Sequence, residues 1–374
     1  MSGTQPEAPT PSSYRVRIAP VNDGSGRREP PELSPRETLE RWLDKLRVDK
    51  ADSTVSAYHY RLKHFIEWCE AEGITAIGDV NGWDIETYET HRRRSGMATV
   101  SLNKELGTLK NFLEYAERIE VVEDGLPEKV DPPDVDQVDQ VDDTRLHPDA
   151  ARELLDTFED SAEWRHSRGH ALLTVAWYVG CRLGGLRALD LGHYDPGART
   201  LEFEHAPDEG TPLKNGRDGE RIVGLQDTVC DVLDGYIEDY RYGHVFDEYG
   251  REPLFTSQQG RPSTNSIRAW IYMATFPCHY RECPHGEDPE VCEFIDYSHA
   301  SKCPSSRSPH QVRTGSITWQ RNQGVPADVV AERVNASVRV IENHYDKPDK
   351  REEMEQRRRH HIDGLDLGEG GRSQ

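Results

Sequence analysis

An acidic stretch of low complexity interrupts the sequence and limits what the chain can fold into. Residues 130–143 read VDPPDVDQVDQVDD, and apolar residues recur at regular spacing before and after them. A segment this rich in carboxylates and proline cannot bury a hydrophobic core, and such composition is typical of linkers. We therefore expect two domains that each build their own core, joined by an acidic linker over residues 119–145.

The region before the linker predicts four amphipathic helices. Ser34 and Glu37 have the spacing of a capping box, and Pro35 suits the first position of a helix. The same analysis predicts further helices that begin near residue 53, cover about 82–93 and span the leucines of 102–113. Because no stretch here has the pattern of a strand, we expect an all-α domain over residues 34–118.

The region after the linker predicts a mixed α+β domain, mainly helical, over residues 146–350. Apolar spacing and helix-start residues predict helices near 149–159, 168–179 and 226–241, and helices that begin near residues 264, 309, 326 and 337. Strands are expected at 200–204 and 221–225, with a strand-to-turn at 254–257. Outside the two domains we expect a flexible arm over residues 1–33 and a charged, frayed tail over residues 351–374.

The composition argues against a secreted or membrane protein. No apolar run approaches the ~18 residues that a membrane span needs. The N-terminal sequence, MSGTQPEAPTPSSYRVR, lacks the apolar core of a signal peptide. We expect a cytoplasmic protein, in which disulfides are rare and clustered cysteines are metal ligands or free thiols.

The charge of the chain is strongly negative. Asp and Glu number 68 against 46 Lys and Arg, a net charge of −22, and only ten of the basic residues are lysine. This balance is typical of adaptation to a salt-rich cytoplasm, because at ~1 M salt the Debye length is about 3 Å and repulsion is tolerated. The alternative is an ordinary acidic protein. Salt adaptation removes the usual argument that so negative a chain does not bind nucleic acid.

Arginine, lysine, histidine and tyrosine are the residues that can carry chemistry in the second domain. His310 and Arg313 lie in the first turn of an expected helix, where the positive helix end favours a phosphate. Arg182 follows an apolar helix, Lys214 lies between two strands, and Tyr345 lies 32 residues beyond Arg313. Taken singly, each has an ordinary explanation, such as a solvated helix start or a core aromatic.

In their order and spacing, these residues resemble the tyrosine recombinase (phage integrase) family, here of a salt-adapted archaeal type. The family has an arginine in a G-[LC]-R box, a hairpin lysine, an H-x-x-R box and a nucleophilic tyrosine. This chain has GCR at 180–182, Lys214, SPHQVR at 308–313 and Tyr345. The resemblance covers most of residues 34–350. It implies a mainly α fold, with a SAM-like core-binding domain before a mixed α+β, mostly helical catalytic domain.

The sequence departs from the family pattern at three places. Ala336 holds the position of the family's second histidine, and Asn335 or His344 is a candidate to replace its hydrogen bond. The glutamate usually found three residues after the first arginine is Gly185, and the hairpin that follows Lys214 is longer than usual.

The resemblance implies a site-specific recombinase that cuts and rejoins DNA through a 3′-phosphotyrosine. Arg182 and Arg313 would clamp the non-bridging phosphate oxygens, a role that suits the planar fork of arginine. His310 would bind the phosphate or accept the proton of Tyr345, and Lys214 would protonate the leaving 5′-oxygen. No cofactor is expected for catalysis. The alternatives are a DNA-binding relative that lost cleavage, which Ala336 favours, and a type IB topoisomerase-like strand nicker.

The expected partner is a double-stranded DNA recombination site. The resemblance implies a clamp of two domains around DNA and a homotetramer on two duplexes, with no membrane association. Basic residues at the end of the third expected helix are candidate DNA contacts: Arg92, Arg93 and Arg94.

Four of the seven cysteines gather in an insertion over residues 276–306. Thiolates in a reducing cytoplasm favour a structural zinc site, and His285 is an alternative ligand. The spacings match no standard zinc finger, so a set of buried free thiols is the other interpretation. The expected ligands are Cys278, Cys283, Cys292 and Cys303.

Overall fold

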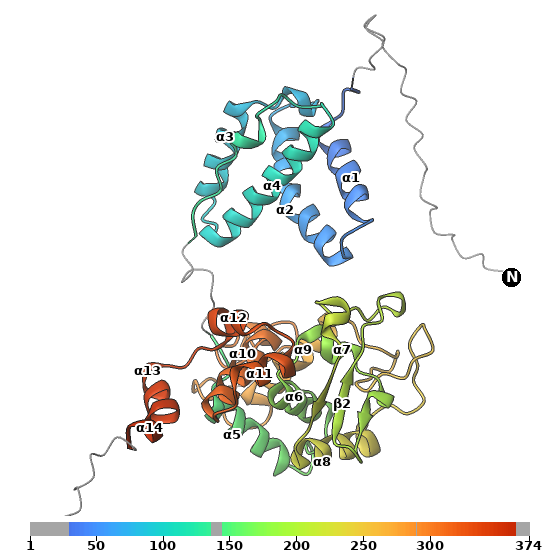
Figure 1. Cartoon of the computed structure of the whole chain (residues 1–374), viewed down its shortest axis with the longest axis vertical. Coiled ribbons are helices and arrows are strands. Elements are labelled where there is room, and N and C mark those ends of the chain that lie inside the picture. The colour runs from blue at the N-terminus through green and yellow to red at the C-terminus, as the bar shows by residue number, and fades with distance from the viewer. Residues whose placement is uncertain (1–29, 136–143, 289, 364–374) are drawn as a thin grey trace, which may run out of the picture. The chain divides into compact units, whose positions relative to one another are not determined.

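The computed structural model describes residues 30–135, 144–288 and 290–363, which fall into two units (Figure 1). The first unit ends at residue 142 and the second begins at residue 143. Most of the expected arm, the Val-Asp-Gln repeats from residue 136 and the end of the tail from residue 364 lie outside the described residues. No helix in these ranges is long and apolar enough to span a bilayer.

The N-terminal unit is all-α, which confirms the expectation from its apolar spacing. The capping box forms, because the Ser34 hydroxyl accepts the Glu37 N–H while the Glu37 carboxylate accepts the Ser34 N–H. Trp42 stacks on Tyr58 with ring centroids 5.4 Å apart, inside a continuous apolar core. Its helices are α1 (Pro35–Leu46), α2 (Asp52–Ala71), α3 (Gly82–Arg94) and α4 (Thr99–Arg118), with short 3₁₀ turns η1 (Ile77–Asp79) and η2 (Pro127–Lys129).

The first part of the expected linker packs on this unit instead of extending away from it. Val122, Leu126 and Val130 are buried in the same core. The Asp131 N–H donates to the Glu89 carboxylate at 2.9 Å. The linker predicted from residue 119 therefore begins too early, because three apolar residues in an acidic context are enough to hold this segment.

The C-terminal unit is mainly helical with a small antiparallel sheet, as its sequence predicted. Its helices are α5 (Pro148–Glu159), α6 (Arg168–Val179), α7 (Leu183–Ala188), α8 (Asp227–Gly235), α9 (Thr264–Ala274), α10 (Pro309–Asn322), α11 (Ala327–Val334), α12 (Val338–Val340), α13 (Lys350–Glu352) and α14 (Arg359–Asp363). Three segments are wound as π-helix: η6 (Tyr236–Tyr240), η9 (Ile341–Tyr345) and η10 (Glu353–Arg358). Short 3₁₀ turns are η3 (Leu191–His193), η4 (Pro207–Glu209), η5 (Gly216–Gly219), η7 (Pro277–His279) and η8 (Ala300–Lys302).

The sheet has three strands in the order β1 (Tyr194–Asp195), β2 (Thr200–Phe203) and β3 (Arg221–Gly224). Leu201 pairs with Val223, and both side chains are buried in the core of the unit. The long connection between β2 and β3 carries Lys214.

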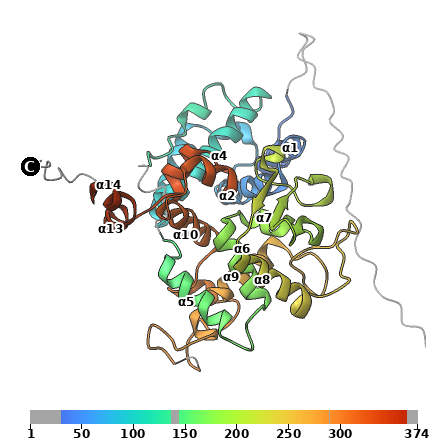
Figure 2. The ribbon, with the colours of Figure 1, turned by 60° about the horizontal axis from the view of Figure 1, so that its bottom comes forward.

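Helix α6 is the centre of this unit and positions the site described below. Its sequence is apolar on nearly all sides, which is typical of a buried helix. It packs against α5, α8, α9 and α10, and Figure 2 shows it among the last three. The chain leaves α6 through Gly180, which has φ +67°. A Cβ at that position would lie 2.9 Å from the Ser316 Oγ, so only glycine fits both the conformation and the space.

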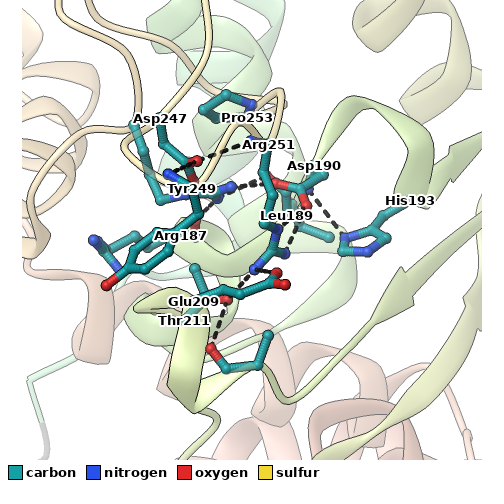
Figure 3. A network of polar contacts seen from close by, with 12 residues as sticks. Arg187, Leu189, Asp190, His193, Glu209, Thr211, Asp247, Tyr249, Arg251 and Pro253 are labelled. Carbon is teal, nitrogen blue, oxygen red and sulfur yellow. Dashed lines mark hydrogen bonds and ion pairs between the residues drawn. The ribbon is translucent and has the colours of Figure 1, made fainter.

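A polar network holds residues 241–262, which include the expected strand-to-turn at 254–257 (Figure 3). The described residues of this segment form isolated bridges, Asp190 with Pro253 and Ser257 with Gly260, so the strand expected at 254–257 is wrong, whereas a turn does follow at Ser257–Gly260. Asp190 instead forms ion pairs with Arg251 and Arg261. Because charged groups decide this conformation, apolar alternation could not predict it.

The tail is ordered further than its charged sequence predicted. Residues 350–363 are helical, and the Arg357 guanidinium donates to both Asn322 Oδ1 and the Asp346 carboxylate. The buried Arg145 pairs with Glu352 at 2.5 Å. The expectation of a frayed tail from residue 351 is therefore wrong, since the tail is helical as far as residue 363 and the contacts of Glu352 and Arg357 hold its first part.

Candidate active site

Arg313 is a buried cation with an incomplete set of partners. Ser308 caps α10 and Pro309 opens it, so Arg313 begins the second turn of the helix, where its side chain is buried in the unit. The residue is 2% exposed, and its Nη1 donates to the carbonyl oxygens of Gly180 at 2.6 Å and Val334 at 2.8 Å. Its Nε and Nη2 make no well-aligned hydrogen bond within the described chain, and the Tyr345 hydroxyl is close enough to interact with the guanidinium. Buried donors without well-aligned partners are costly, and two of them on one guanidinium match the geometry of an oxyanion.

A second guanidinium lies close to the first. Arg182 directly precedes α7, and its Nη1 donates to the Asn335 carbonyl at 2.6 Å. Burial, opposed by Tyr345 and assisted by Arg182, lowers the pKa of Arg313 to about 10. The Arg313 guanidinium still carries its charge at neutral pH. Two neighbouring cations in a poorly solvated place favour a bound anion.

Tyr345 and His310 complete the cluster. The Tyr345 ring is 7% exposed, and its centroid lies 4.6 Å from the guanidinium carbon of Arg313. The His310 ring lies 5.3 Å from the Tyr345 ring, centroid to centroid. Thr318 on α10 donates to the Tyr345 carbonyl at 2.9 Å and holds the end of η9 against α10. The structure thus brings together a phenol, an imidazole and two guanidiniums that the sequence separates widely.

The other predicted residues differ in their exposure and contacts. Lys214 is exposed on the β2–β3 connection, and His344 is exposed next to Tyr345 in the chain. Ala336 is half-buried and packs against the small apolar cluster that contains Ile341 and Tyr345. Asn335 accepts from Arg182 through its carbonyl, while its side chain bonds to the β2–β3 connection.

Backbone carbonyls are the part of the site that motif analysis missed. The oxygens of Gly180, Val334 and Asn335 hold the two guanidiniums. Backbone oxygens leave no residue-type signal, but glycine and asparagine at two helix ends are typical of left-handed caps. Those caps turn the carbonyl groups of α6 and α11 towards the site.

Arg92 was predicted to contact DNA, but in the N-terminal unit it is buried in an ion pair with Glu105. It is 8% exposed, and its guanidinium binds both carboxylate oxygens of Glu105 at 2.6 and 2.7 Å. The Tyr88 hydroxyl donates to the same carboxylate, so this group ties α3 to α4. Arg93 and Arg94 are exposed at the end of α3.

In the cysteine insertion, Cys278 is hydrogen-bonded to Cys283 and lies within electrostatic range of Cys292 and Cys303. No three His, Cys, Asp or Glu side chains in the described ranges are grouped closely enough to hold an ion. Cys303 is buried beside Phe276, whereas Cys278, Cys283 and Cys292 are half-buried. The imidazole of His285, the alternative ligand, is hydrogen-bonded to the Ser305 hydroxyl at 2.9 Å.

Comparison with known proteins agrees with this architecture. Residues 39–120 match the family "Phage integrase, N-terminal SAM-like domain". The N-terminal domain of a phage integrase/site-specific recombinase from Haloarcula marismortui is 50% identical, over 28% of this chain and 99% of that one, with a TM-score of 0.27. No curated protein sequence matches this chain.

Two solved integrases share the fold across both units. The integrase of transposon Tn1549, in complex with a circular intermediate DNA, is 14% identical over 89% of this chain and 99% of that one, with a TM-score of 0.61. A lambda integrase dimer bound to a core site is 12% identical over 85% and 79%, with a TM-score of 0.58. Residues 39–120 thus belong to the SAM-like N-terminal domain family of phage integrases, and the chain has the fold of the tyrosine recombinases.

Proposed function

We propose that this chain is a site-specific DNA recombinase, an integrase that cuts and rejoins DNA through a 3′-phosphotyrosine. One observation carries the proposal: the buried Arg313 has two N–H donors without a well-aligned partner beside a second guanidinium, and a phenol lies against it. A phosphodiester supplies the oxygens these donors need, and a tyrosine is a nucleophile that preserves the energy of the broken bond. The shared fold of the two integrases supports the same conclusion.

The chemistry assigns one role to each residue. Arg182 and Arg313 bind the non-bridging oxygens and stabilise the charge that develops on them. The Tyr345 oxygen attacks phosphorus, and its proton passes to His310, because a free phenol has a pKa of ~10 and is mostly protonated. The bond to the 5′-oxygen breaks as Lys214 protonates that oxygen. The 3′-phosphate stays on Tyr345 until a 5′-hydroxyl attacks in the reverse reaction.

The proposed partner is a double-stranded DNA recombination site, bound by a homotetramer that holds two duplexes. The Tn1549 and lambda integrases were solved with DNA, and the lambda protein as a dimer on a core site. The exposed guanidiniums of Arg93 and Arg94 are the proposed contacts of the N-terminal unit with the DNA backbone. The charge of −22 supports a salt-rich cytoplasm, of the kind found in salt-adapted archaea, as the working medium.

A second candidate function is DNA binding without cleavage. Ala336 favours it, because its methyl group packs into the apolar cluster under Tyr345 and offers no hydrogen bond to a phosphate. An SDS-resistant adduct separates the two functions, since only a cleaving enzyme bonds to DNA.

The test uses nicked duplexes from the DNA that flanks this protein's own coding sequence. Wild-type protein is expected to form an adduct that survives SDS, while Tyr345→Phe binds the duplex equally in a mobility-shift assay and forms none. Binding without an adduct in the wild type would favour the non-cleaving function. Relaxation of supercoiled DNA lacking a recombination site would favour a topoisomerase-like nicker.

We also propose that the insertion at 276–306 binds a structural zinc ion through its four cysteines, with no part in catalysis. The support is the number of the thiols and the very small apolar cluster of the insertion, whose buried members are Phe276, Ala300 and Cys303. Segments with so little apolar core usually need a metal or another covalent staple. Cys278 is already hydrogen-bonded to Cys283 and lies within electrostatic range of Cys292 and Cys303, so the four thiols have only to tighten around an ion.

A further inference from the structure

Asn335 stands at the point where α11 ends and its backbone is left-handed. Its φ is +54° and its ψ is 66°, a conformation that asparagine accepts more readily than most residues. The turn directs its carbonyl group to Arg182, whose Nη1 lies 2.6 Å away. One backbone atom of Asn335 therefore fixes one of the two guanidiniums of the site.

The side chain of Asn335 contacts a distant part of the chain. Its Oδ1 accepts a hydrogen bond from the Asn215 side chain, and its Nδ2 donates to the Asp218 carbonyl at 3.2 Å. A Cβ at Gly219 would lie 2.9 Å from the same Nδ2, so the loop passes very close to the amide. Both ends of the Asn335 amide are thus used by the β2–β3 connection.

This connection is the segment that carries the general acid. Lys214 directly precedes Asn215, and its side chain is exposed. A general acid has to come within about 2.6–3.2 Å of the oxygen it protonates. A displacement of about 1 Å can reduce a rate on the order of 100-fold. Anchoring of the loop next to Lys214 therefore bears directly on the protonation step.

The contacts of the Asn335 side chain are not those of a residue that replaces the family's second histidine, whose position Ala336 holds. Such a substitute would direct its side chain to the phosphate, whereas the Asn335 amide bonds to the loop at both its oxygen and its nitrogen. Only its backbone carbonyl contacts an arginine of the site.

We propose that Asn335 is a positioning residue that fixes the Lys214 loop relative to Arg182, so that the ammonium group reaches the leaving 5′-oxygen. This inference rests on the proposed recombinase function. The side chain of Asn335 supports leaving-group protonation by positioning Lys214, and its backbone carbonyl supports phosphate binding by positioning Arg182.

The test replaces the leaving oxygen by sulfur, in a DNA duplex with a 5′-bridging phosphorothiolate at the cleaved bond. A thiolate leaves without a proton, because thiols have a pKa of ~8.5. Asn335→Gly is the informative variant, since glycine keeps the left-handed turn and the carbonyl that binds Arg182 and removes only the amide. It is expected to form adduct 10- to 100-fold more slowly than wild type on ordinary DNA, and near the wild-type rate on the sulfur substrate.

Three control variants fix the interpretation. Lys214→Ala is expected to show the same rescue by sulfur, and Asn215→Ala a weaker form of it. Arg182→Ala is expected to be slow on both substrates, because its role is to bind the phosphate. Equal slowing of Asn335→Gly on both substrates, or no slowing on either, would overturn the inference. A wild-type protein that forms adduct on neither substrate would instead remove the recombinase function itself.

Discussion

At the scale of residues, the side chains around the Arg313 guanidinium could be predicted from the sequence, and the backbone groups that hold it could not. The H-x-x-R spacing placed His310 and Arg313 together, and the order of the boxes added Arg182 and Tyr345. The structure brings all four into one cluster. The carbonyl oxygens that hold the arginines were not predictable, because any residue type has one and only the path of the backbone decides where it points.

Arg92 shows the opposite case, in which residue type misleads. A run of three arginines at a helix end favours a basic surface, yet the first of them is buried against Glu105. The pair joins residues thirteen positions apart on different helices. Exposure of a charged residue depends on such tertiary partners, which sequence spacing does not reveal.

His170 makes the stability of the C-terminal unit depend on pH. Burial, reinforced by His166 and Arg165, lowers the pKa of His170 from 6.5 to about 4. Above pH 6.5 the histidine is neutral in both the folded and the unfolded chain. Between pH 6.5 and 4 only the unfolded chain takes up the proton. The free energy of unfolding therefore decreases as the pH is lowered, by about 2 kcal/mol at pH 5.

The measurement is urea unfolding of the full chain at pH 7.5 and pH 5. His170→Gln is the matched variant, because glutamine keeps a polar group and does not titrate. The wild type is expected to lose about 2 kcal/mol more than the variant between the two pH values. Equal losses in the two proteins would show that His170 does not set this dependence.

At the scale of elements, the long amphipathic or fully apolar helices and the strands β2 and β3 were predictable, whereas β1 and α7 were not. The helices α1 to α6 and α8 to α11 begin within a few residues of their predicted starts, since capping residues and apolar spacing act locally. The strand β1 has two residues and α7 has six, too few for a pattern to show. The segment around residues 254–257 and the tail helices depend on Asp190 and Arg145, which are distant in the chain.

The cysteine insertion supplies a prediction about one element. If zinc binds to Cys278, Cys283, Cys292 and Cys303, its binding energy stabilises the fold of residues 276–306. Removal of the metal by a chelator is expected to expose this segment to protease and to slow adduct formation, because α10 with His310 and Arg313 follows directly. The N-terminal unit is expected to stay intact.

Metal analysis of the purified protein is the first measurement, with about one zinc per chain expected from four thiolate ligands. Cys303→Ser is expected to lower the zinc content, and Cys230→Ala, outside the insertion, is the control that keeps it. Metal-free protein with normal cleavage would instead support the interpretation as free thiols.

The whole molecule carries a charge of −22 and is nevertheless proposed to bind a polyanion. Contacts to phosphates weaken steeply with salt, with a slope of about −0.9 in log K for each phosphate neutralised. A protein adapted to a salt-rich cytoplasm has to rely more on base contacts, burial and contacts between subunits. We therefore expect specific DNA binding to persist in molar KCl.

Fluorescence anisotropy of a labelled recombination site, titrated with protein from 0.2 to 2 M KCl, measures this dependence. A shallow slope and retained binding above 1 M are expected. Complete loss of binding well below 1 M KCl would show that the acidic surface does not reflect a salt-rich working medium.

The most direct test of the account is the identity of the residue that bonds to DNA. The SDS-resistant adduct is digested with nuclease and trypsin, and tandem mass spectrometry locates the remaining nucleotide on the peptide. The account predicts a nucleotide 3′-phosphate on the hydroxyl of Tyr345. A nucleotide on any other residue, including the neighbouring His344, would contradict it.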